Sequence, residues 1–330
     1  MGSALPRSAC CSLHRQCCGK RTASRWPARA ARIVAVGFPC RTGTAGGRGA
    51  REKVSSRTGR VGSVASPLTF HILGVVEARN GADLVPLSGK QRSLLAVLLL
   101  QVNCTVTNTR LMDAVWGRPL PAAPETRVRT LVSELRRSLS RHGFDGIQTK
   151  PSGYVIRVED SQLDLTLFLA KVRQAREAVI DGMPGAALKA YDEALALWGG
   201  TALTGASGPF ADGEGARLEE LRLTVMEERF GALLQLGRPA EVVSDLSRLV
   251  VHHPLREGLH AQLMTALYRS GRRSEALDLY RSLRSRLVQE LGMEPLTELR
   301  DLQQQMLSSV PVSELAPHEQ RTAPAYARRR

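Results

Sequence analysis

Arginine and hydroxyl side chains gather on one side of an amphipathic segment, PETRVRTLVSELRRSLSRHG, at residues 124–143. Its apolar residues recur at steps of three and four, the period of a single stripe on an α-helix. Such a helix can bury one face and present guanidinium and hydroxyl groups to a nucleic acid, because arginine bonds both phosphate and guanine edges. The stripe comprises Val128, Leu131, Val132, Leu135 and Leu139; the opposite face carries Thr126, Arg129, Thr130, Ser133 and Arg137, with Arg127, Arg136 and Arg141 on its flanks.

Ordinary surface helices show the same pattern, so the segments that precede this one must decide between the two interpretations. The stretch LTFHILGVVEARNGADLVPL alternates and is rich in β-branched residues, and Asn80-Gly81 predicts a tight turn within a small sheet over residues 68–87. Ser88 is expected to cap a largely apolar helix that forms a buried hub. Thr107 or Asn108 then caps a short helix that ends at Gly117.

The segment after the arginine-rich helix, IQTKPSGYVIRV, predicts a β-hairpin that turns at residues 150–153. Sheet, three helices and hairpin is the layout of a winged helix. In such domains the second helix of the helix–turn–helix enters the major groove, and the hairpin tip reaches an adjacent backbone or minor groove. Taken together, these elements predict that residues 67–158 bind nucleic acid.

The charge is distributed unevenly along the 330 residues, whose net charge is +15. Residues 1–66 hold 13 Lys/Arg and one acid, residues 67–158 hold 12 and 6, residues 159–310 hold 17 and 22, and residues 311–330 hold 4 and 2. The basic middle fits a polyanionic partner, and the acidic half does not. Residues 1–66 are expected to be a disordered basic tail or a misassigned start, and residues 311–330 a disordered tail.

The acidic half shows a helical-repeat pattern. Gly182 is followed at +5, +9 and +12 by Ala187, Tyr191 and Ala194; the Gly271 segment repeats the first two spacings with Ala276 and Tyr280. Gly237 lies 34 residues before Gly271, and this period is that of tetratricopeptide repeats. We therefore expect an all-α repeat domain over residues 159–310, with a loop from Gly199 to Gly215. The complete fold class is mainly α with a small α+β part, a winged helix-turn-helix followed by the tetratricopeptide-like domain.

Other kinds of chemistry find little support. Five cysteines, Cys10, Cys11, Cys17, Cys18 and Cys40, lie in the first 66 residues and lack CxxC spacing, so no metal site is expected. His252, His253 and His260 have no carboxylate at ligand spacing, and Trp116 and Trp198 are expected in the core. No nucleophile elbow or paired carboxylates indicate an enzyme, and no cofactor is expected. The body is expected to be cytoplasmic, without a secretory signal or membrane span.

The combination resembles a known family. Residues 68–158 resemble an OmpR-type winged helix through LTFHILGVVEA, KQRSLLAVLLL, RLMDAVWG, TLVSELRRSL and GYVIRV. Residues 162–307 resemble the bacterial transcriptional activation domain, from LDLTLFLAKVRQAR to the phrase LG-x-EP-x3-LR-x-L at residues 291–302. Together they look like a short member of the antibiotic regulatory protein (SARP) family.

The resemblance implies a pathway-specific transcriptional activator for a secondary-metabolite gene cluster. It implies binding to direct repeats of double-stranded DNA near the promoter by two protomers, with recruitment of RNA polymerase and its sigma factor. No receiver domain is expected before the winged helix. The base-reading residues would be Thr130, Ser133, Glu134 and Arg137, and the phosphate contacts would be Thr126, Arg127, Arg129, Arg136, Arg141, Lys150 and Tyr154.

Glu134 departs from the family pattern, since relatives often carry Arg or Gln at this position. A carboxylate can accept a hydrogen bond from cytosine N4 but cannot bond guanine, so Glu134 is expected to alter operator preference. Two alternatives remain: a helical-repeat adaptor that tethers to nucleic acid without specificity, and an RNA-binding module.

Overall fold

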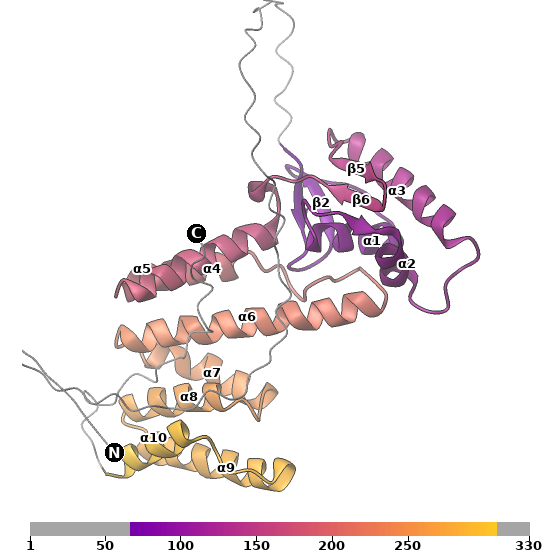
Figure 1. Cartoon of the computed structure of the whole chain (residues 1–330). Helices are drawn as coiled ribbons and strands as arrows, with labels where there is room; N and C mark the ends of the chain where they lie inside the picture. The colour runs from indigo at the N-terminus through magenta and orange to yellow at the C-terminus, as the bar shows by residue number, and fades with distance from the viewer. Residues whose placement is uncertain (1–66, 309–330) are drawn as a thin grey trace, which may run out of the picture. The chain divides into compact units, whose positions relative to one another are not determined.

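The computed structural model describes residues 67–308, and the predictions made for residues 1–66 and 309–330 lie outside that range. The N-terminal part contains two small antiparallel sheets around three helices (Figure 1). This is the winged-helix layout expected from the sequence. Its elements are β1 (Thr69–His71), β2 (Glu77–Asn80), β3 (Asp83–Leu84), α1 (Gly89–Leu100), β4 (Val106–Thr107), α2 (Asn108–Trp116), α3 (Pro124–Ser140), β5 (Ile147–Lys150) and β6 (Gly153–Ile156).

The first sheet has the order β1-β2-β3, and its second turn differs by one position from the prediction. Asn80 pairs with Asp83, so the loop consists of Gly81 and Ala82 rather than Asn80-Gly81. Gly81 has φ of 60°, which is the left-handed conformation that glycine adopts without a Cβ clash. Asn80 remains in the strand because its backbone still belongs to the ladder.

The helix starts follow the expected capping residues. Ser88 accepts a hydrogen bond from the backbone N–H of Gln91, and the Gln91 side chain bonds back to Ser88, which completes a capping box. Thr107 caps α2 by accepting from the backbone N–H of Arg110, and α2 stops before Gly117 at φ 68°. Helix α1 is buried from Ser93 through Leu99 and therefore forms the predicted hub.

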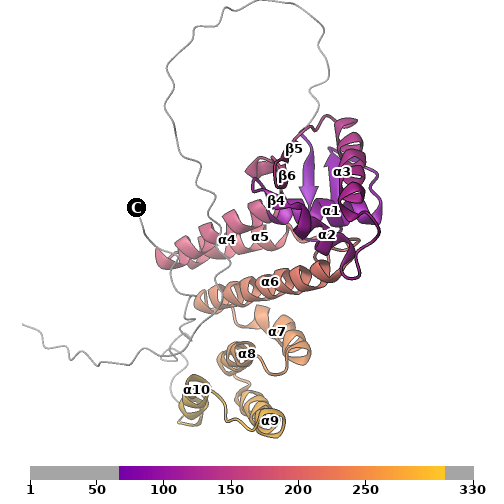
Figure 2. The ribbon, with the colours of Figure 1, turned by 45° about the vertical axis from the view of Figure 1, so that its right-hand side comes forward.

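The C-terminal part is a succession of helical hairpins, preceded by the 3₁₀ turn η1 (Asp160–Gln162). Figures 1 and 2 show α6, α7 and α8 following the α4–α5 pair as successive layers. Gly182, Gly237 and Gly271 lie at the α4–α5, α6–α7 and α8–α9 turns with φ near 70°, which explains their spacing in the sequence. The helices are α4 (Asp164–Ile180), α5 (Pro184–Leu195), α6 (Pro209–Gln235), α7 (Ala240–His252), α8 (Glu257–Arg269), α9 (Arg273–Leu291) and α10 (Thr297–Leu307).

The predicted loop from Gly199 to Gly215 is wrong in its second half. Helix α6 already begins at Pro209, so Gly213 and Gly215 lie inside a helix although glycine is a poor helix former. Proline suits the first helical position, and Ala211 is buried at 8 % exposure. Packing of the first turn of α6 therefore outweighs the low helix propensity of Gly213 and Gly215, which follow it.

The buried side chains form two clusters. One runs from the winged helix through α4, α5 and the first half of α6, and includes Trp198 at 8 % exposure as expected. The other joins the second half of α6 to α7, α8, α9 and α10. Trp116 is half-buried and only borders the first cluster. None of the helices between residues 67 and 308 combines the length and apolar character that crossing a bilayer requires.

Candidate DNA interface

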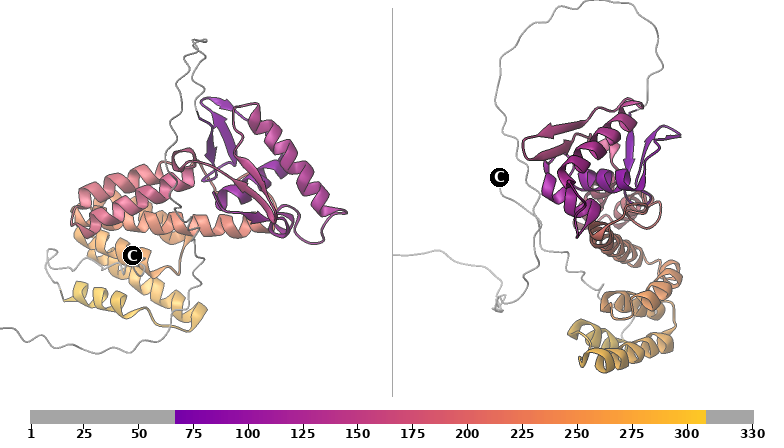
Figure 3. Two further views of the ribbon diagram at one scale, coloured as in Figure 1. Left: turned by 45° about the horizontal axis from the view of Figure 1, so that its top comes forward. Right: turned by 90° about the vertical axis from the view of Figure 1, so that its right-hand side faces the viewer.

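Helix α3 docks on the winged helix through the predicted apolar stripe. Val128 and Val132 are 1 % exposed, Leu131 is 7 % exposed, and Leu135 and Leu139 are fully buried. Figure 3 shows α3, in magenta, along one side of the strands of this part of the chain. The prediction of the buried face is confirmed, and the rotation of α3 about its axis is thereby fixed.

The opposite face of α3 is exposed. Its side chains make few contacts: the Thr130 hydroxyl donates to the Thr126 carbonyl at 3.1 Å, and Arg129 lies 4.0 Å from Glu125 of its own helix. Because Arg129 and Glu125 are 71 % and 67 % exposed, this ion pair contributes little stability. The exposed residues of this face are Thr126, Arg129, Thr130, Ser133, Glu134 and Arg137.

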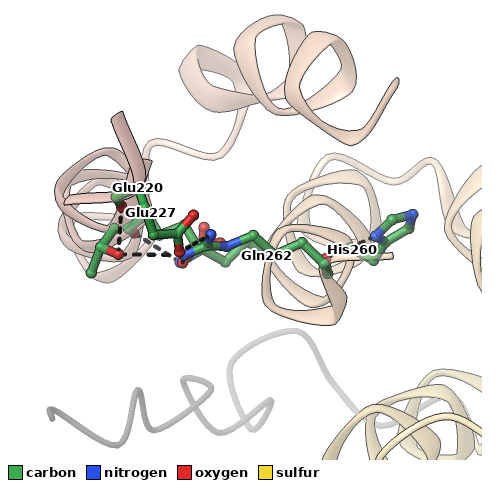
Figure 4. Close-up of polar contacts among 6 residues, drawn as sticks. Glu220, Glu227, His260 and Gln262 are labelled. Carbon is green, nitrogen blue, oxygen red and sulfur yellow. Dashed lines mark hydrogen bonds and ion pairs between the residues drawn. The ribbon is translucent and has the colours of Figure 1, made fainter. Parts of the chain in front are cut away.

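Within residues 67–308, no ion pair joins an arginine of α3 to the acidic half of the chain. The arginines of that half instead pair with their own neighbours. Arg256, for example, donates to Glu220 and Glu227 of α6, which Figure 4 shows at this contact. Other such pairs are Arg176–Glu228, Arg229–Asp192, Arg238–Glu241, Arg272–Glu275 and Arg284–Glu294. The acidic half therefore pairs many of its own arginines and forms no ion pair with those of α3 within residues 67–308.

The wing is the β5–β6 hairpin, and it is tied to the start of α2. Lys150 pairs with Gly153 across the hairpin, and the N–H of Asn108 donates to the Ser152 carbonyl at 3.1 Å. Gly153 lies so close to β4 that a Cβ there would stand 1.9 Å from the Val106 carbonyl oxygen. This close backbone approach explains glycine at the position and brings the wing beside the helix–turn–helix.

Two residues predicted to contact phosphate are engaged inside the fold. Arg136 donates from Nε to the Ile147 carbonyl at 3.1 Å and from its guanidinium to the Thr149 hydroxyl at 2.9 Å. Its guanidinium carbon also lies 5.7 Å from the centroid of the Tyr154 ring, and Tyr154 is only 7 % exposed. No residue spacing indicates these contacts, because they depend on the placement of the hairpin against α3.

The remaining predicted phosphate contacts lie at both ends of α3 and on the wing. Arg127 is exposed and donates from Nε to the Ala122 carbonyl at 3.1 Å, Arg141 is exposed, and Lys150 is half-buried. Arg110 on α2 and Arg118 in the α2–α3 turn are further exposed cations of this domain. Sequence reasoning missed both, because neither belongs to the periodic face of α3. The roles of all these residues on DNA stay predictions.

The winged helix is joined to the acidic half by buried polar contacts. The Asp164 carboxylate accepts the N–H groups of Ile72 and Leu73 at 2.8 and 2.9 Å and is 4 % exposed. Burial raises the pKa of Asp164, although these N–H bonds and His71 act in the opposite direction. Ser207 donates its N–H to the Ser93 hydroxyl at 2.8 Å, so helix α1 of the winged-helix core is also attached.

Backbone hydrogen bonds extend the same junction. The segment after β1 exchanges bonds with the segment after α5: Leu203 N–H donates to Ile72, Thr204 N–H donates to Gly74, and Val76 N–H donates to Thr204, at 2.9 to 3.1 Å. A Cβ at Gly74 would meet the Gly199 backbone at 3.1 Å. The base of the winged helix is therefore fixed on the first helices of the acidic half.

Two family models match the chain in the order expected from the sequence. The transcriptional regulatory protein C-terminal model matches residues 81–156, and the bacterial transcriptional activator domain model matches residues 163–307. The first match contains α1, α2, α3 and the wing. The second begins directly after η1 and contains α4 through α10.

The chain is also similar to regulators of actinobacteria. It is 42 % identical over 252 residues to regulatory protein AfsR of Streptomyces griseus, covering 76 % of this chain and 26 % of AfsR. It is 36 % identical to regulatory protein DnrI of Streptomyces peucetius, covering 74 % of this chain and 93 % of DnrI. The chain thus spans about a quarter of AfsR and nearly the whole of DnrI.

A solved structure has the same fold. Mycobacterium tuberculosis EmbR, in complex with a low affinity phosphopeptide, superposes with a TM-score of 0.71 at 30 % identity, over 74 % of this chain and 66 % of EmbR. The family models, the relatives and the exposed cationic face of α3 all indicate a DNA-binding transcriptional regulator. The chain belongs to the SARP family of DNA-binding transcriptional activators.

Proposed function

We propose that the protein is a pathway-specific activator of a secondary-metabolite gene cluster. It binds direct repeats near the promoter and helps RNA polymerase with its sigma factor to bind there. The observation that carries the DNA part is the exposed face of α3, whose arginines lack ion pairs to residues 159–308. Exposed guanidinium groups gain affinity when they neutralise closely spaced phosphates and release their counterions, so this face favours a DNA duplex as partner.

The proposed DNA contacts are of two kinds, contacts to base edges and contacts to phosphates. Thr130, Ser133, Glu134 and Arg137 face the base edges of the major groove, where each good contact is worth about 1–3 kcal/mol of discrimination. Phosphate neutralisation by the flanking cations supplies most of the affinity and makes it fall steeply with salt. The candidate cations are Arg127, Arg129, Arg136, Arg141 and Lys150, and the neutral hydroxyls of Thr126 and Tyr154 are candidate hydrogen-bond donors to phosphate.

The acidic half faces protein partners. Its net negative charge repels DNA, which leaves its helical hairpins for a second protomer on the adjacent repeat or for polymerase. The buried junction at Asp164 supports this proposal, since it keeps these hairpins at a fixed distance from α3. A DNA-bound protomer thereby presents the same protein surface at every promoter, in the bacterial cytoplasm.

Selection of bound fragments from a bacterial genome tests the proposal. The full chain is mixed with sheared genomic DNA at a fixed salt concentration, and the recovered fragments are sequenced. One or a few sites with evenly spaced repeats next to a biosynthetic cluster support the pathway-specific activator. Diffuse recovery would favour the alternative, an adaptor that tethers without sequence preference, and preferential recovery of RNA in a parallel selection would favour an RNA-binding module.

A polymerase arm tests recruitment separately. The selected promoter fragment is incubated with limiting RNA polymerase holoenzyme, with and without the protein. We expect the protein to increase promoter occupancy by the holoenzyme. Unchanged occupancy with intact operator binding would reject recruitment while leaving DNA binding in place.

A further inference from the structure

Arg136 lies on α3 between the buried stripe and the exposed face, and it is half-buried where Arg137 is exposed. Its guanidinium is directed along the protein surface to the hairpin. Nε donates to the Ile147 carbonyl at 3.1 Å and Nη2 donates to the Thr149 hydroxyl at 2.9 Å. Both acceptors belong to β5, so Arg136 bonds one strand of the wing at two points.

The second strand of the wing is held through Tyr154. Its ring lies 5.7 Å from the Arg136 guanidinium carbon, and its backbone pairs with Thr149 on one side and Val106 on the other. The sheet order is β4-β6-β5, so β5 is the edge strand and β6 is the centre. Arg136 therefore anchors the open edge and the centre of this sheet to α3 at the same time.

We propose that Arg136 is a positioning residue, which holds the β5–β6 hairpin against α3 so that Lys150 meets the DNA backbone in register with the base-reading face. This inference rests on the proposed function and changes one role within it, since the same residue is otherwise a candidate phosphate contact. Lys150 ends β5, one position after Thr149, so motion of the edge strand moves its ammonium group directly.

Arginine is suited to this role and lysine is not. The guanidinium presents several N–H groups in a rigid planar fork and can stack on an aromatic face while it donates. A lysine ammonium at the same place retains the charge but cannot bond Ile147 and Thr149 in that geometry. Charge and positioning can therefore be separated by the variants Arg136→Lys and Thr149→Val.

A double-mutant cycle with Lys150 measures the coupling. Operator affinity is determined at several salt concentrations for the wild type, Arg136→Gln, Lys150→Ala and the double variant. Arg136→Gln should weaken binding about as much as Lys150→Ala. In the Lys150→Ala background it should weaken binding less than about twofold further, because the effects of two residues coupled through the same strand are not additive. The salt slope of the double variant should equal that of Lys150→Ala.

Arg141 supplies the matched control. It is an exposed cation just after α3, and its side chain makes no hydrogen bond or ion pair within residues 67–308. Arg141→Ala should combine additively with Lys150→Ala, each removing about one unit from the salt slope. If Arg136→Gln behaves like Arg141→Ala, with full additivity and a further loss of slope, Arg136 is a phosphate contact and the inference fails.

Hydrogen exchange of the free protein tests the anchor without DNA and so stands even if the proposed function fails. Amides of residues 147–156 should exchange faster in Arg136→Gln, Arg136→Lys and Thr149→Val than in the wild type. The melting temperature of the protein should be unchanged in all three variants. Arg141→Ala should leave them unchanged. Equal exchange in the wild type and all three variants would overturn the inference, whatever the DNA measurements show.

Discussion

The Asp164 carboxylate accepts the backbone N–H of Ile72 at 2.8 Å, across 92 positions of sequence, inside the junction between the winged helix and the acidic half. The same oxygen accepts the Leu73 N–H at 2.9 Å, and the other carboxylate oxygen accepts from the Leu165 N–H. One side chain thus satisfies both the bend after β1 and the start of α4. The DNA-binding and activation parts are fixed to each other at this point.

Asp164→Ala should destabilise the protein by roughly 2–4 kcal/mol, because two buried N–H groups lose their acceptor. Urea unfolding followed by tryptophan fluorescence, to which the buried Trp198 contributes, measures this. Asp160→Ala is the control, since Asp160 is exposed in the preceding 3₁₀ turn and should change stability by less than about 0.5 kcal/mol. Equal stability of the wild type and Asp164→Ala would show that these bonds contribute nothing.

Gly153→Ala should damage the wing selectively. The added Cβ would lie 1.9 Å from the Val106 carbonyl oxygen, which is backbone and cannot rotate away. We expect the free energy of unfolding, measured by thermal denaturation, to fall by about 1–3 kcal/mol, and DNA binding to weaken. Gly185→Ala in α5, where no atom lies within 4 Å of the new Cβ, should be neutral or slightly stabilising. A fully stable Gly153→Ala protein would mean that β4 and β6 are not paired.

His260 should make stability depend on pH. It is 4 % exposed on α8, its Nδ1 lies 3.0 Å from the Arg256 carbonyl, and burial lowers its pKa below the ordinary value of 6.5. Protons therefore bind the unfolded chain more readily, so the free energy of unfolding should fall as pH decreases from about 6.5 to the lower pKa of the folded state, and level off below it. Urea titrations between pH 7.5 and 5 should show a smaller decrease in the free energy of unfolding for His260→Gln than for the wild type. The same decrease in both proteins would refute the assignment.

Glu134→Gln should change which base the protein prefers at one position of each repeat. Glutamate can accept from cytosine N4, whereas glutamine suits adenine, and the difference is worth about 1–3 kcal/mol. Selection from a randomised repeat, sequenced for wild type and variant, measures the preference. Glu125→Gln, in the first turn of the same helix, serves as the control. Unchanged affinity and selectivity in Glu134→Gln would reject a base-reading role.

Local sequence signals predicted much of the fold. Ser88 and Thr107 mark helix starts because their hydroxyls can accept the first free N–H groups. The spacing of Gly182, Gly237 and Gly271 predicted the helical repeat, and the structure adds that each lies at a turn with positive φ. The stripe of α3 predicted its buried face since helix period and burial agree. These signals act within one or two turns of the residue that carries them.

Contacts between distant segments were not predictable in the same way. Neither the bonds from Asp164 to Ile72 nor those from Arg136 to β5 follow from any spacing, because they depend on how complete elements pack. The helix that begins at Pro209 was hidden by Gly213 and Gly215 for the same reason. The sequence therefore predicted which face of α3 is buried and which is exposed, but not how the wing is held against it, and the DNA contacts themselves stay predictions.

The most direct test compares Arg137→Ala with Arg248→Ala in operator binding by fluorescence anisotropy, on specific and scrambled DNA. Both arginines are exposed on helices, but Arg137 lies on the open face of α3 and Arg248 pairs with Asp245 on α7. We predict that Arg137→Ala weakens specific binding about tenfold or more, reduces the preference for the operator and leaves the melting temperature unchanged, while Arg248→Ala binds like the wild type. Equal binding by both variants would contradict the claim that α3 reads DNA.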